Sequence, residues 1–136
     1  MTSQGSRHGA RRLLLQALYQ EQIAGHDVAE LIEQFSVRDE FATVDSDYFC
    51  AVLKDVLSRT VELDELIDGF LDRPIRQLDP VEHALLWLGA SELLSQADVP
   101  VNVIINEAVE LAKEFGAQDS YRYINAVLDK ASKSLR

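Results

Sequence analysis

The sequence predicts an all-α fold, a compact bundle of about seven helices. Glycine and proline are scarce, with six and three among 136 residues. Apolar side chains recur every three or four positions, which is the spacing of a helix face and not of a strand. A chain of this length is typical of one domain, so residues 1–136 are expected to form a single domain.

The first half of the chain contains three helical stretches. The first ends at Gly25, a residue type that commonly follows a helix. A second runs from about residue 27 to 35, and a third begins after Asp45. The apolar periodicity then continues to Leu71, either as the same helix bent or as a separate helix, and it stops before Pro74.

The clearest helix start lies at Asp79. Its carboxylate suits the N-cap, Pro80 suits the first helical position, where no N–H is needed, and Glu82 can complete a capping box. The residues from there to Leu94 are apolar on almost every side. Such a helix is expected in the centre of the bundle, with neighbours on several sides.

Two more helices are expected toward the C-terminus. One follows Pro100 and stops at Gly116. The last is capped by Asp119 or Ser120, and its apolar stripe begins at Tyr121, whose ring is expected in the core. The sequence has no internal repeat and no low-complexity segment.

Charge is distributed unevenly along the chain. Taken as a sum, the net charge of −10 disfavours binding to nucleic acid or to an anionic membrane. Residues 1–24 nevertheless sum to +2 and residues 111–136 also to +2, while residues 25–110 sum to −14. If the fold brings the two ends together, they form a basic patch on an acidic body. The alternative is an ordinary solvated surface.

The sequence favours a binding protein over an enzyme. It contains no glycine-rich phosphate loop, no serine nucleophile elbow and no zinc-protease motif, and its three histidines lack metal-ligand spacing. Neither a cofactor nor a metal is expected. Cys50 is the one cysteine, so it is expected to be a small core residue in a reducing compartment. No transmembrane stretch or signal-peptide core is found, and the chain is expected in the cytoplasm.

A basic cluster lies at the start of the first helix. Residues three and four apart are neighbours on a helix, so its basic side chains share one face. They are Arg7, His8, Arg11 and Arg12. A guanidinium group can donate two parallel hydrogen bonds to phosphate oxygens and can stack on a base, so this face suits an RNA or DNA backbone. The alternative is a solvated helix end.

The start of the last helix is a second candidate for nucleic-acid binding. Arg122 provides a charge, Tyr123 an aromatic ring, and Asn125 an amide that can hydrogen-bond a base edge. Core packing is the alternative for Tyr123.

Six runs of residues then point to a known family. They are AR at 10–11, QALY at 16–19, DVP at 98–100, INEAVELAK at 105–113, FG at 115–116 and INAVLD at 124–129. In this order, over nearly the whole chain, they resemble the bacterial transcription antitermination factors of the NusB family. The INEAVELAK run is the most specific of the six.

The resemblance implies two small helical bundles and a protein partner. The partner is the small-subunit ribosomal protein that doubles as antitermination factor NusE. Together the two proteins are expected to bind the boxA element of RNA, notably in ribosomal RNA leaders, and to keep the RNA polymerase elongation complex transcribing.

The resemblance also assigns roles to residues. The arginine-rich RNA-binding segment of the family corresponds to Arg7, Arg11 and Arg12, with His8 at a position that is commonly basic and Gln16 on the same helix. The family's second RNA patch corresponds to Asp119, Ser120, Arg122, Tyr123 and Asn125.

The partner face of the family corresponds to Tyr19 and to the acidic segment around Glu82, since a carboxylate suits a basic ribosomal protein. The chain departs from the family pattern at Trp87 and Ser91, where a basic residue and a tyrosine are frequent, and at Ala126, where glycine is usual. The first departure implies a phosphate contact that is lost or replaced by stacking.

Two other functions are consistent with the sequence. One is a protein-only helical adaptor, or a homodimer, whose RNA face is weak or covered; Trp87 and Leu94 are candidates for an apolar patch in such a dimer. The other is the related helical module that precedes ribosomal-RNA cytosine methyltransferase domains, but this chain has no room for the catalytic domain.

Overall fold

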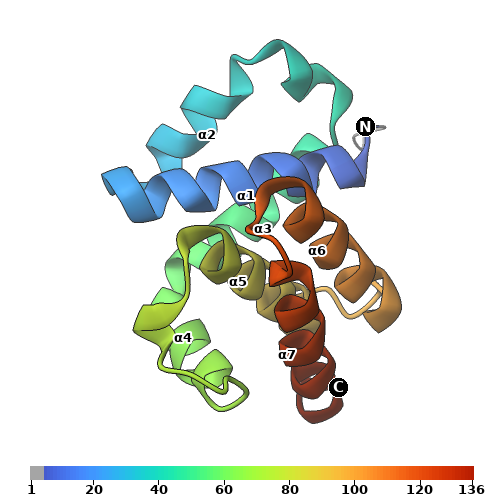
Figure 1. The fold of residues 1–136 in the computed structure, drawn as a ribbon. Coiled ribbons are helices and arrows are strands. Elements are labelled where there is room, and N and C mark those ends of the chain that lie inside the picture. Colours follow the sequence, from blue (N-terminus) through green and yellow to red (C-terminus); the bar gives the residue numbers. More distant parts are fainter. Residues whose placement is uncertain (1–4) are drawn as a thin grey trace. The chain divides into compact units, whose positions relative to one another are not determined.

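A computed structural model describes residues 5–136 as a succession of seven α-helices and two 3₁₀-helices (Figure 1). The α-helices are α1 (Arg7–Ala24), α2 (Val28–Ser36), α3 (Ser46–Ser58), α4 (Thr60–Asp68), α5 (Pro80–Ser95), α6 (Val101–Phe115) and α7 (Ser120–Leu135). The 3₁₀-helices are η1 (Asp39–Thr43) and η2 (Ile75–Gln77). Contacts divide the chain into unit 1, up to Ser58, and unit 2, from Arg59. The all-α prediction and the two helical bundles are confirmed.

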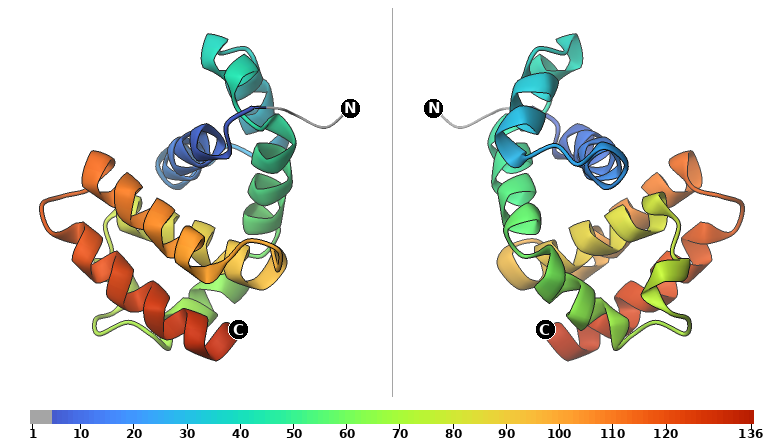
Figure 2. Two further views of the ribbon diagram at one scale, coloured as in Figure 1. Left: turned by 90° about the vertical axis from the view of Figure 1, so that its right-hand side faces the viewer. Right: turned by 90° about the vertical axis from the view of Figure 1, so that its left-hand side faces the viewer.

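Unit 1 is formed by α1, α2, η1 and α3, and each of its three α-helices packs on the other two (Figure 2). Its core holds a group of aromatic rings: Phe35 of α2 and Phe49 of α3 lie with their centroids 5.7 Å apart, and Phe41 of η1 meets Phe49 edge-on at 5.5 Å. Phe35 and Phe49 are fully buried. Aromatic pairs of this geometry stabilise a core beyond the area that they bury.

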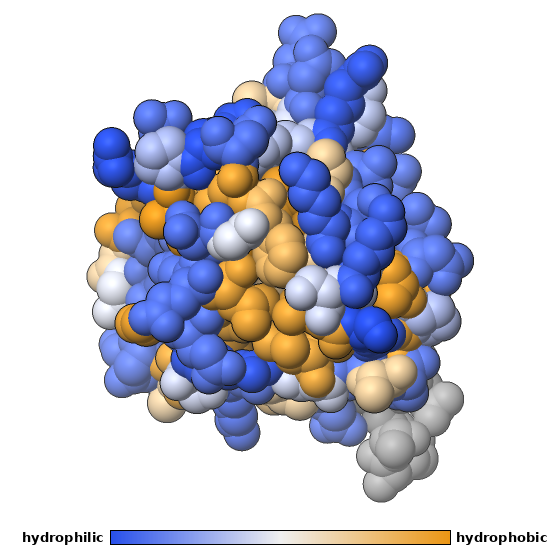
Figure 3. Space-filling model, turned by 90° about the horizontal axis from the view of Figure 1, so that it is seen from below, coloured by the Kyte–Doolittle hydropathy of each residue, from blue (hydrophilic) through white to orange (hydrophobic). Residues whose placement is uncertain are grey.

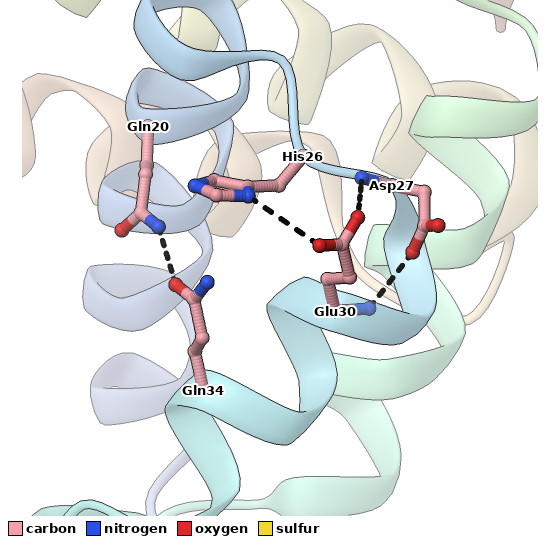
Figure 4. Close-up of polar contacts among 5 residues, drawn as sticks. All are labelled: Gln20, His26, Asp27, Glu30 and Gln34. Carbon is pink, nitrogen blue, oxygen red and sulfur yellow. Dashed lines mark hydrogen bonds and ion pairs between the residues drawn. The ribbon is translucent and has the colours of Figure 1, made fainter.

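The corner between α1 and α2 is held by local polar contacts (Figure 4). Gly25 ends α1 in the left-handed conformation, with φ of 71°. Asp27 and Glu30 then form a capping box at the start of α2, in which each side chain accepts from the other residue's backbone N–H. Gln20 donates a hydrogen bond to Gln34, so the side chains also join the two helices.

Unit 2 is built around α5, which contacts α4, α6 and α7 (Figure 2). Eleven of its sixteen residues are buried, as expected for a helix that is apolar on almost every side. Gly89 allows α7 to approach closely, because a Cβ at this position would lie 2.7 Å from a methyl group of Leu128. The central position predicted for this helix within its bundle is confirmed.

The two ends of α5 are stabilised by polar side chains. At its start, the capping box predicted for Asp79 and Glu82 is confirmed. At its end, Arg136 donates hydrogen bonds to four carbonyl oxygens at 2.5 to 3.1 Å. These oxygens belong to Glu92, Leu93, Gln96 and Val99. Glu92 and Leu93 belong to the last turn of the helix, where carbonyls lack the partner that a following turn would supply. Glu92 O also accepts from Gln96 N at 3.0 Å.

An apolar cluster lies beside this end of α5. It consists of Leu93, Val99, Ile104 and Ala131, with Phe70, Val101 and Leu135 partly buried against it.

Seen from below, apolar side chains gather on the surface between hydrophilic margins (Figure 3). The chain therefore leaves some of its apolar surface exposed, which is common at sites of protein contact.

Of the two alternatives predicted for the stretch after α3, the structure has the separate helix, because Arg59 has φ of −148° and ψ of 42°, outside the helical region. Other details differ from the sequence prediction. Asp119 is the N-cap of α7, but its side chain makes no capping bond, since its φ is 70°. Tyr121 is half-buried, so its predicted core position is wrong. Trp87 is 5% exposed and therefore supplies no apolar surface patch.

Trp87 is held by polar neighbours within unit 2. Its indole Nε1 donates to Asp64 Oδ1 at 2.7 Å, and His83 Nε2 lies 2.6 Å from the same oxygen. The imidazole and indole rings lie with their centroids 4.4 Å apart. Ser91, the other departure on this helix, is fully buried. Neither residue thus offers a surface on which a base could stack.

Candidate nucleic-acid interface

The N-terminal basic segment is anchored before α1 begins. Ser6 caps α1 by accepting from Gly9 N at 2.9 Å. The Ser6 backbone also pairs with the segment before α3, donating to Thr43 O at 2.9 Å and accepting from Asp45 N at 3.0 Å. At Gly5 a Cβ would lie 2.1 Å from the Val44 carbonyl, so only glycine fits there. These contacts fix the position of Arg7 on unit 1.

Arg7 lies against α3. Its guanidinium carbon is 4.2 Å from the centroid of the Tyr48 ring, and its Nε is 3.5 Å from Asp45 Oδ2. The other oxygen of Asp45 caps α3 by accepting from Tyr48 N at 3.1 Å. The Arg7 side chain is 44% exposed. It therefore remains accessible to a ligand while the ring and the carboxylate hold it in place.

The other basic residues of α1 differ in exposure. Arg11 lies 5.4 Å over the same Tyr48 ring but is only 3% exposed. His8 is exposed and Arg12 is half-buried. The expectation that all three guanidinium groups face solvent does not hold for Arg11, because this side chain turns inward to the Tyr48 ring.

Gln16 has a cationic neighbour that the sequence did not indicate. Its Oε1 accepts from Arg38 Nη1 at 2.9 Å, and the Arg38 guanidinium lies 3.9 Å over the Phe35 ring. Arg38 lies 22 residues further along the chain, in a stretch without periodicity. No spacing rule connects such residues, so only the fold of unit 1 reveals Arg38 as part of this basic surface.

The start of α7 carries the second group, in unit 2. Arg122 is 72% exposed and its Nε lies 3.5 Å from Asp119 Oδ1. Ser120 is buried, and its hydroxyl donates to Glu82 Oε2 at 3.1 Å. Asn125 lies exposed one turn further along the helix. Arg122 and Asn125 therefore present polar groups to solvent, whereas Ser120 ties α7 to the start of α5.

Two tyrosine rings beside this helix start carry cations. Lys113 Nζ is 5.0 Å and the Arg122 guanidinium 5.5 Å from the Tyr121 ring centroid. Arg73, from the turn between α4 and η2, lies 3.9 Å over the Tyr123 ring. Burial raises the pKa of the Tyr123 hydroxyl, so the ring stays neutral. Basic and aromatic groups thus alternate here, an arrangement that suits a nucleic-acid strand.

The two residues expected on the partner face differ in accessibility. Tyr19 of α1 is 43% exposed, and Ile23, one turn further, is 63% exposed. Glu82 is 7% exposed, and its two carboxylate oxygens accept from Asp79 N and from the Ser120 hydroxyl. Tyr19 thus offers surface to another protein, while Glu82 has its oxygens engaged within unit 2.

Each group of predicted residues is brought together within its own unit. Arg7, His8, Arg11, Arg12 and Gln16 all lie on α1 of unit 1, and the residues from Asp119 to Asn125 lie at the start of α7 in unit 2. A single face formed by both groups stays a prediction.

In residues 5–136, no group of three or more His, Cys, Asp or Glu side chains is arranged to hold a metal ion. None of the described helices is both long and apolar enough to cross a bilayer.

Comparison with solved structures identifies the same fold elsewhere. The NusB of T. maritima superposes with a TM-score of 0.84 and is 26% identical, covering 98% of this chain and 93% of its own. A NusB solved together with NusE and double-stranded RNA superposes with a TM-score of 0.80. It is 24% identical, and the match covers 94% of this chain and 96% of that one.

Sequence comparison gives nearer relatives. The transcription antitermination protein NusB of Alcanivorax borkumensis is 50% identical over 131 residues, and that of Hahella chejuensis is 48% identical over 130. Each match covers 96% of this chain and 87% of the relative. The NusB family itself matches residues 8–133. With a match of that extent and relatives that share about half of its residues, the chain belongs to the NusB family of transcription antitermination factors.

Proposed function

We propose that this protein binds RNA together with NusE and promotes processive transcription. The RNA is the boxA element, notably in ribosomal RNA leaders, and the complex acts on elongating RNA polymerase. The observation that carries the proposal is the exposed basic and aromatic group in each unit of a NusB-family chain whose remaining sequence is strongly acidic.

On the RNA side, the accessible cations are the strongest support. Arg7 and Arg122 are 44% and 72% exposed, and each pairs with one carboxylate at 3.5 Å. Exposed ion pairs of this kind contribute little stability, so a phosphate can displace the carboxylate. We assign RNA contacts to the accessible residues predicted from the sequence, in unit 1 and in unit 2, and propose that one RNA strand contacts both groups. They are Arg7, His8, Arg12, Gln16, Asp119, Arg122, Tyr123 and Asn125. The two buried residues of the predicted set, Arg11 and Ser120, are assigned a supporting role.

On the protein side, charge and apolar surface support NusE as the partner. Residues 25–110 carry a charge of −14, which suits a basic ribosomal protein. We place Tyr19 in this interface because its ring is exposed beside Ile23. Glu82 contributes by joining α5 to α7 as well as by its charge. A relative of the same fold has been solved with NusE and double-stranded RNA.

The proposed role involves binding and no catalysis. It also places the protein in the cytoplasm, where transcription by bacterial RNA polymerase takes place. The family match extends across both units, which supports residues 1–136 as one NusB-like domain.

A titration of fluorescein-labelled boxA RNA tests the proposal. Binding is expected to be much tighter when NusE is present than with either protein alone. Roughly four to six phosphate contacts to a single strand give a slope of about −3 to −4 for log K against log salt concentration. A scrambled RNA of the same length is the control.

The alternative function is a protein-only adaptor or a homodimer, favoured by the exposed apolar surface. Failure of boxA RNA to bind at low salt, with and without NusE, would support this alternative and contradict the proposed function. Size-exclusion chromatography at several concentrations then separates a dimer from a monomer.

A further inference from the structure

The turn between α4 and η2 carries a basic residue that the sequence did not connect with RNA. Arg73 lies in this turn, and its guanidinium carbon is 3.9 Å from the centroid of the Tyr123 ring on α7. Its Nε donates to Asp72 Oδ1 at 3.1 Å. Both residues belong to unit 2, so the contact lies within one compact unit.

The Arg73 guanidinium is held on one side and open on the other. A guanidinium has five N–H donors in a planar fork. Only the Nε donor is used, and within residues 5–136 the two terminal amino groups make no hydrogen bond. The side chain is 39% exposed. Ring stacking and the Asp72 contact orient the group, and the four remaining donors match the oxygens of a phosphate.

The same arrangement changes what Tyr123 can do. The sequence suggested that its ring stacks on a base, but the Arg73 guanidinium already covers one face of the ring. The Tyr123 hydroxyl is buried and lies beside Asp72, the residue that also pairs with Arg73. The residue therefore supports Arg73, and the polar group that can meet a ligand is the guanidinium.

The electrostatic surroundings leave room for an anion. Asp72 is the nearest acidic group, and at 65% exposure it forms only a solvated ion pair with Arg73. Glu82 also acts on Arg73 but is buried and engaged with Ser120. Arg122 lies on the Tyr121 ring close to the start of the same helix and adds a second exposed cation. A phosphate can thus replace Asp72 as the partner of Arg73, because the displaced Asp72 carboxylate remains in solvent.

We propose that Arg73 binds a backbone phosphate of the RNA, which extends the RNA-binding surface from the start of α7 onto the α4–η2 turn. The inference rests on the proposed function, because it assigns a further contact to the same RNA. The ligand group is a phosphodiester of a single strand, read by charge and geometry and not by base identity.

Two alanine substitutions, each of which removes one positive charge, test the assignment. In titrations of fluorescein-labelled boxA RNA with NusE present, Arg73→Ala is expected to weaken binding about tenfold, the size of one charge-assisted hydrogen-bonded contact. The salt slope becomes shallower by about 0.7, the value for one phosphate of a single strand. Arg76→Ala is the matched control, since Arg76 is an exposed arginine of the neighbouring η2. It is expected to change the affinity by less than about twofold.

A further variant separates a phosphate contact from a structural role. Arg73→Lys keeps the charge, so it is expected to retain the wild-type salt slope while losing part of the affinity of the planar fork. If Arg73→Ala loses stability, seen as a lower Tm, the affinity of Arg73→Lys becomes the decisive measurement. A weaker affinity at the wild-type slope supports the phosphate contact, and the wild-type affinity contradicts it.

Each failure has a distinct signature. If the wild type binds RNA with NusE but Arg73→Ala has the same affinity and slope, the contact does not exist while the proposed function stands. If Arg73→Ala weakens binding to NusE in the absence of RNA and leaves the salt slope unchanged, the residue belongs to a protein interface and the proposal is overturned. If the wild type binds no boxA RNA with NusE at low salt, both proposals fail together.

Discussion

Arg136 shows how much a single side chain contributes when it meets the end of a helix. It donates to four carbonyl oxygens around the C-terminus of α5, where the helix dipole favours a cation. We expect Arg136→Ala to lower the free energy of unfolding by about 1–2 kcal/mol, because all four carbonyls lose a charged donor. Glu92 O and Gln96 O keep a backbone donor each, the N–H groups of Gln96 and Val99. Urea denaturation followed by circular dichroism measures the change.

A neighbouring cation provides the comparison. Lys133 is 76% exposed and pairs only with Asp129 on its own helix. Lys133→Ala is therefore expected to leave the free energy of unfolding within about 0.5 kcal/mol of the wild type. Equal effects of the two substitutions would show that Arg136 acts through its charge alone and not through the carbonyl contacts.

Gly25 is the residue at which backbone conformation requires glycine. Its φ of 71° is the left-handed region, and space around it is open. Gly25→Ala should thus cost about 1 kcal/mol through backbone strain alone, while Gly25→Asn should cost less. Thermal denaturation checks this. Gly69→Ala is the control, because Gly69 has a φ of −65° and a Cβ there meets its nearest neighbour at 3.6 Å. A loss of stability in this control as large as that of Gly25→Ala would contradict the explanation.

Contacts between distant residues are what the sequence could not predict at this scale. The basic and aromatic residue types at both ends were sufficient to name Arg7 and Arg122. Arg38 and Arg73 could not be identified from the sequence, because their partners, Gln16 and Tyr123, lie far away along the chain and come close only in the folded protein. The burial of Arg11 could not be predicted for the same reason, since it depends on the Tyr48 ring of α3.

Among the helices, α5 has the start that is most clearly determined by its own residues. Glu82 N donates to Asp79 Oδ1 at 2.8 Å, and Asp79 N donates to Glu82 Oε1 at 3.2 Å. Asp79→Ala is expected to reduce the free energy of unfolding by about 1 kcal/mol, since it leaves a backbone N–H without its cap. Asp79→Asn retains a side-chain oxygen and is expected to lose much less. A urea series on the three proteins decides this, and an unchanged Asp79→Ala would exclude a capping role.

Helix boundaries could be predicted where the signal is local. A cap, a proline or a terminal glycine acts within one turn, so the end of α1, the start of α5 and both limits of α6 follow from the sequence. The η1 and η2 turns are too short to show a period. The separation of α3 from α4 depends on the backbone of one residue, Arg59, which no residue preference specifies.

At the scale of the whole molecule, charge placement matters more than net charge. A chain of net charge −10 repels RNA on average, so its affinity has to come from a few exposed cations. Arg7 belongs to unit 1 and Arg122 to unit 2. If one RNA strand contacts both, each alanine substitution reduces the salt slope by about 0.7, and the double variant reduces it by about 1.4.

This double variant is measured against a charge control in which Lys54, an exposed residue of α3, is changed to alanine. Lys54→Ala is expected to leave the slope unchanged. A double variant with the slope of one single variant would mean that only one unit contacts the RNA, and the idea of a common RNA surface would then be wrong.

The polar contacts of Trp87 also determine what an optical experiment can observe. The chain has one tryptophan, and its indole is buried in unit 2 with its N–H on Asp64 and the His83 ring beside it. Excitation at wavelengths absorbed only by indole therefore reports the environment of α4 and α5. Unit 1 contains tyrosines but no tryptophan, so tryptophan fluorescence does not directly report whether unit 1 becomes more or less ordered on RNA binding. A tryptophan placed at Tyr19 would give unit 1 a fluorophore of its own.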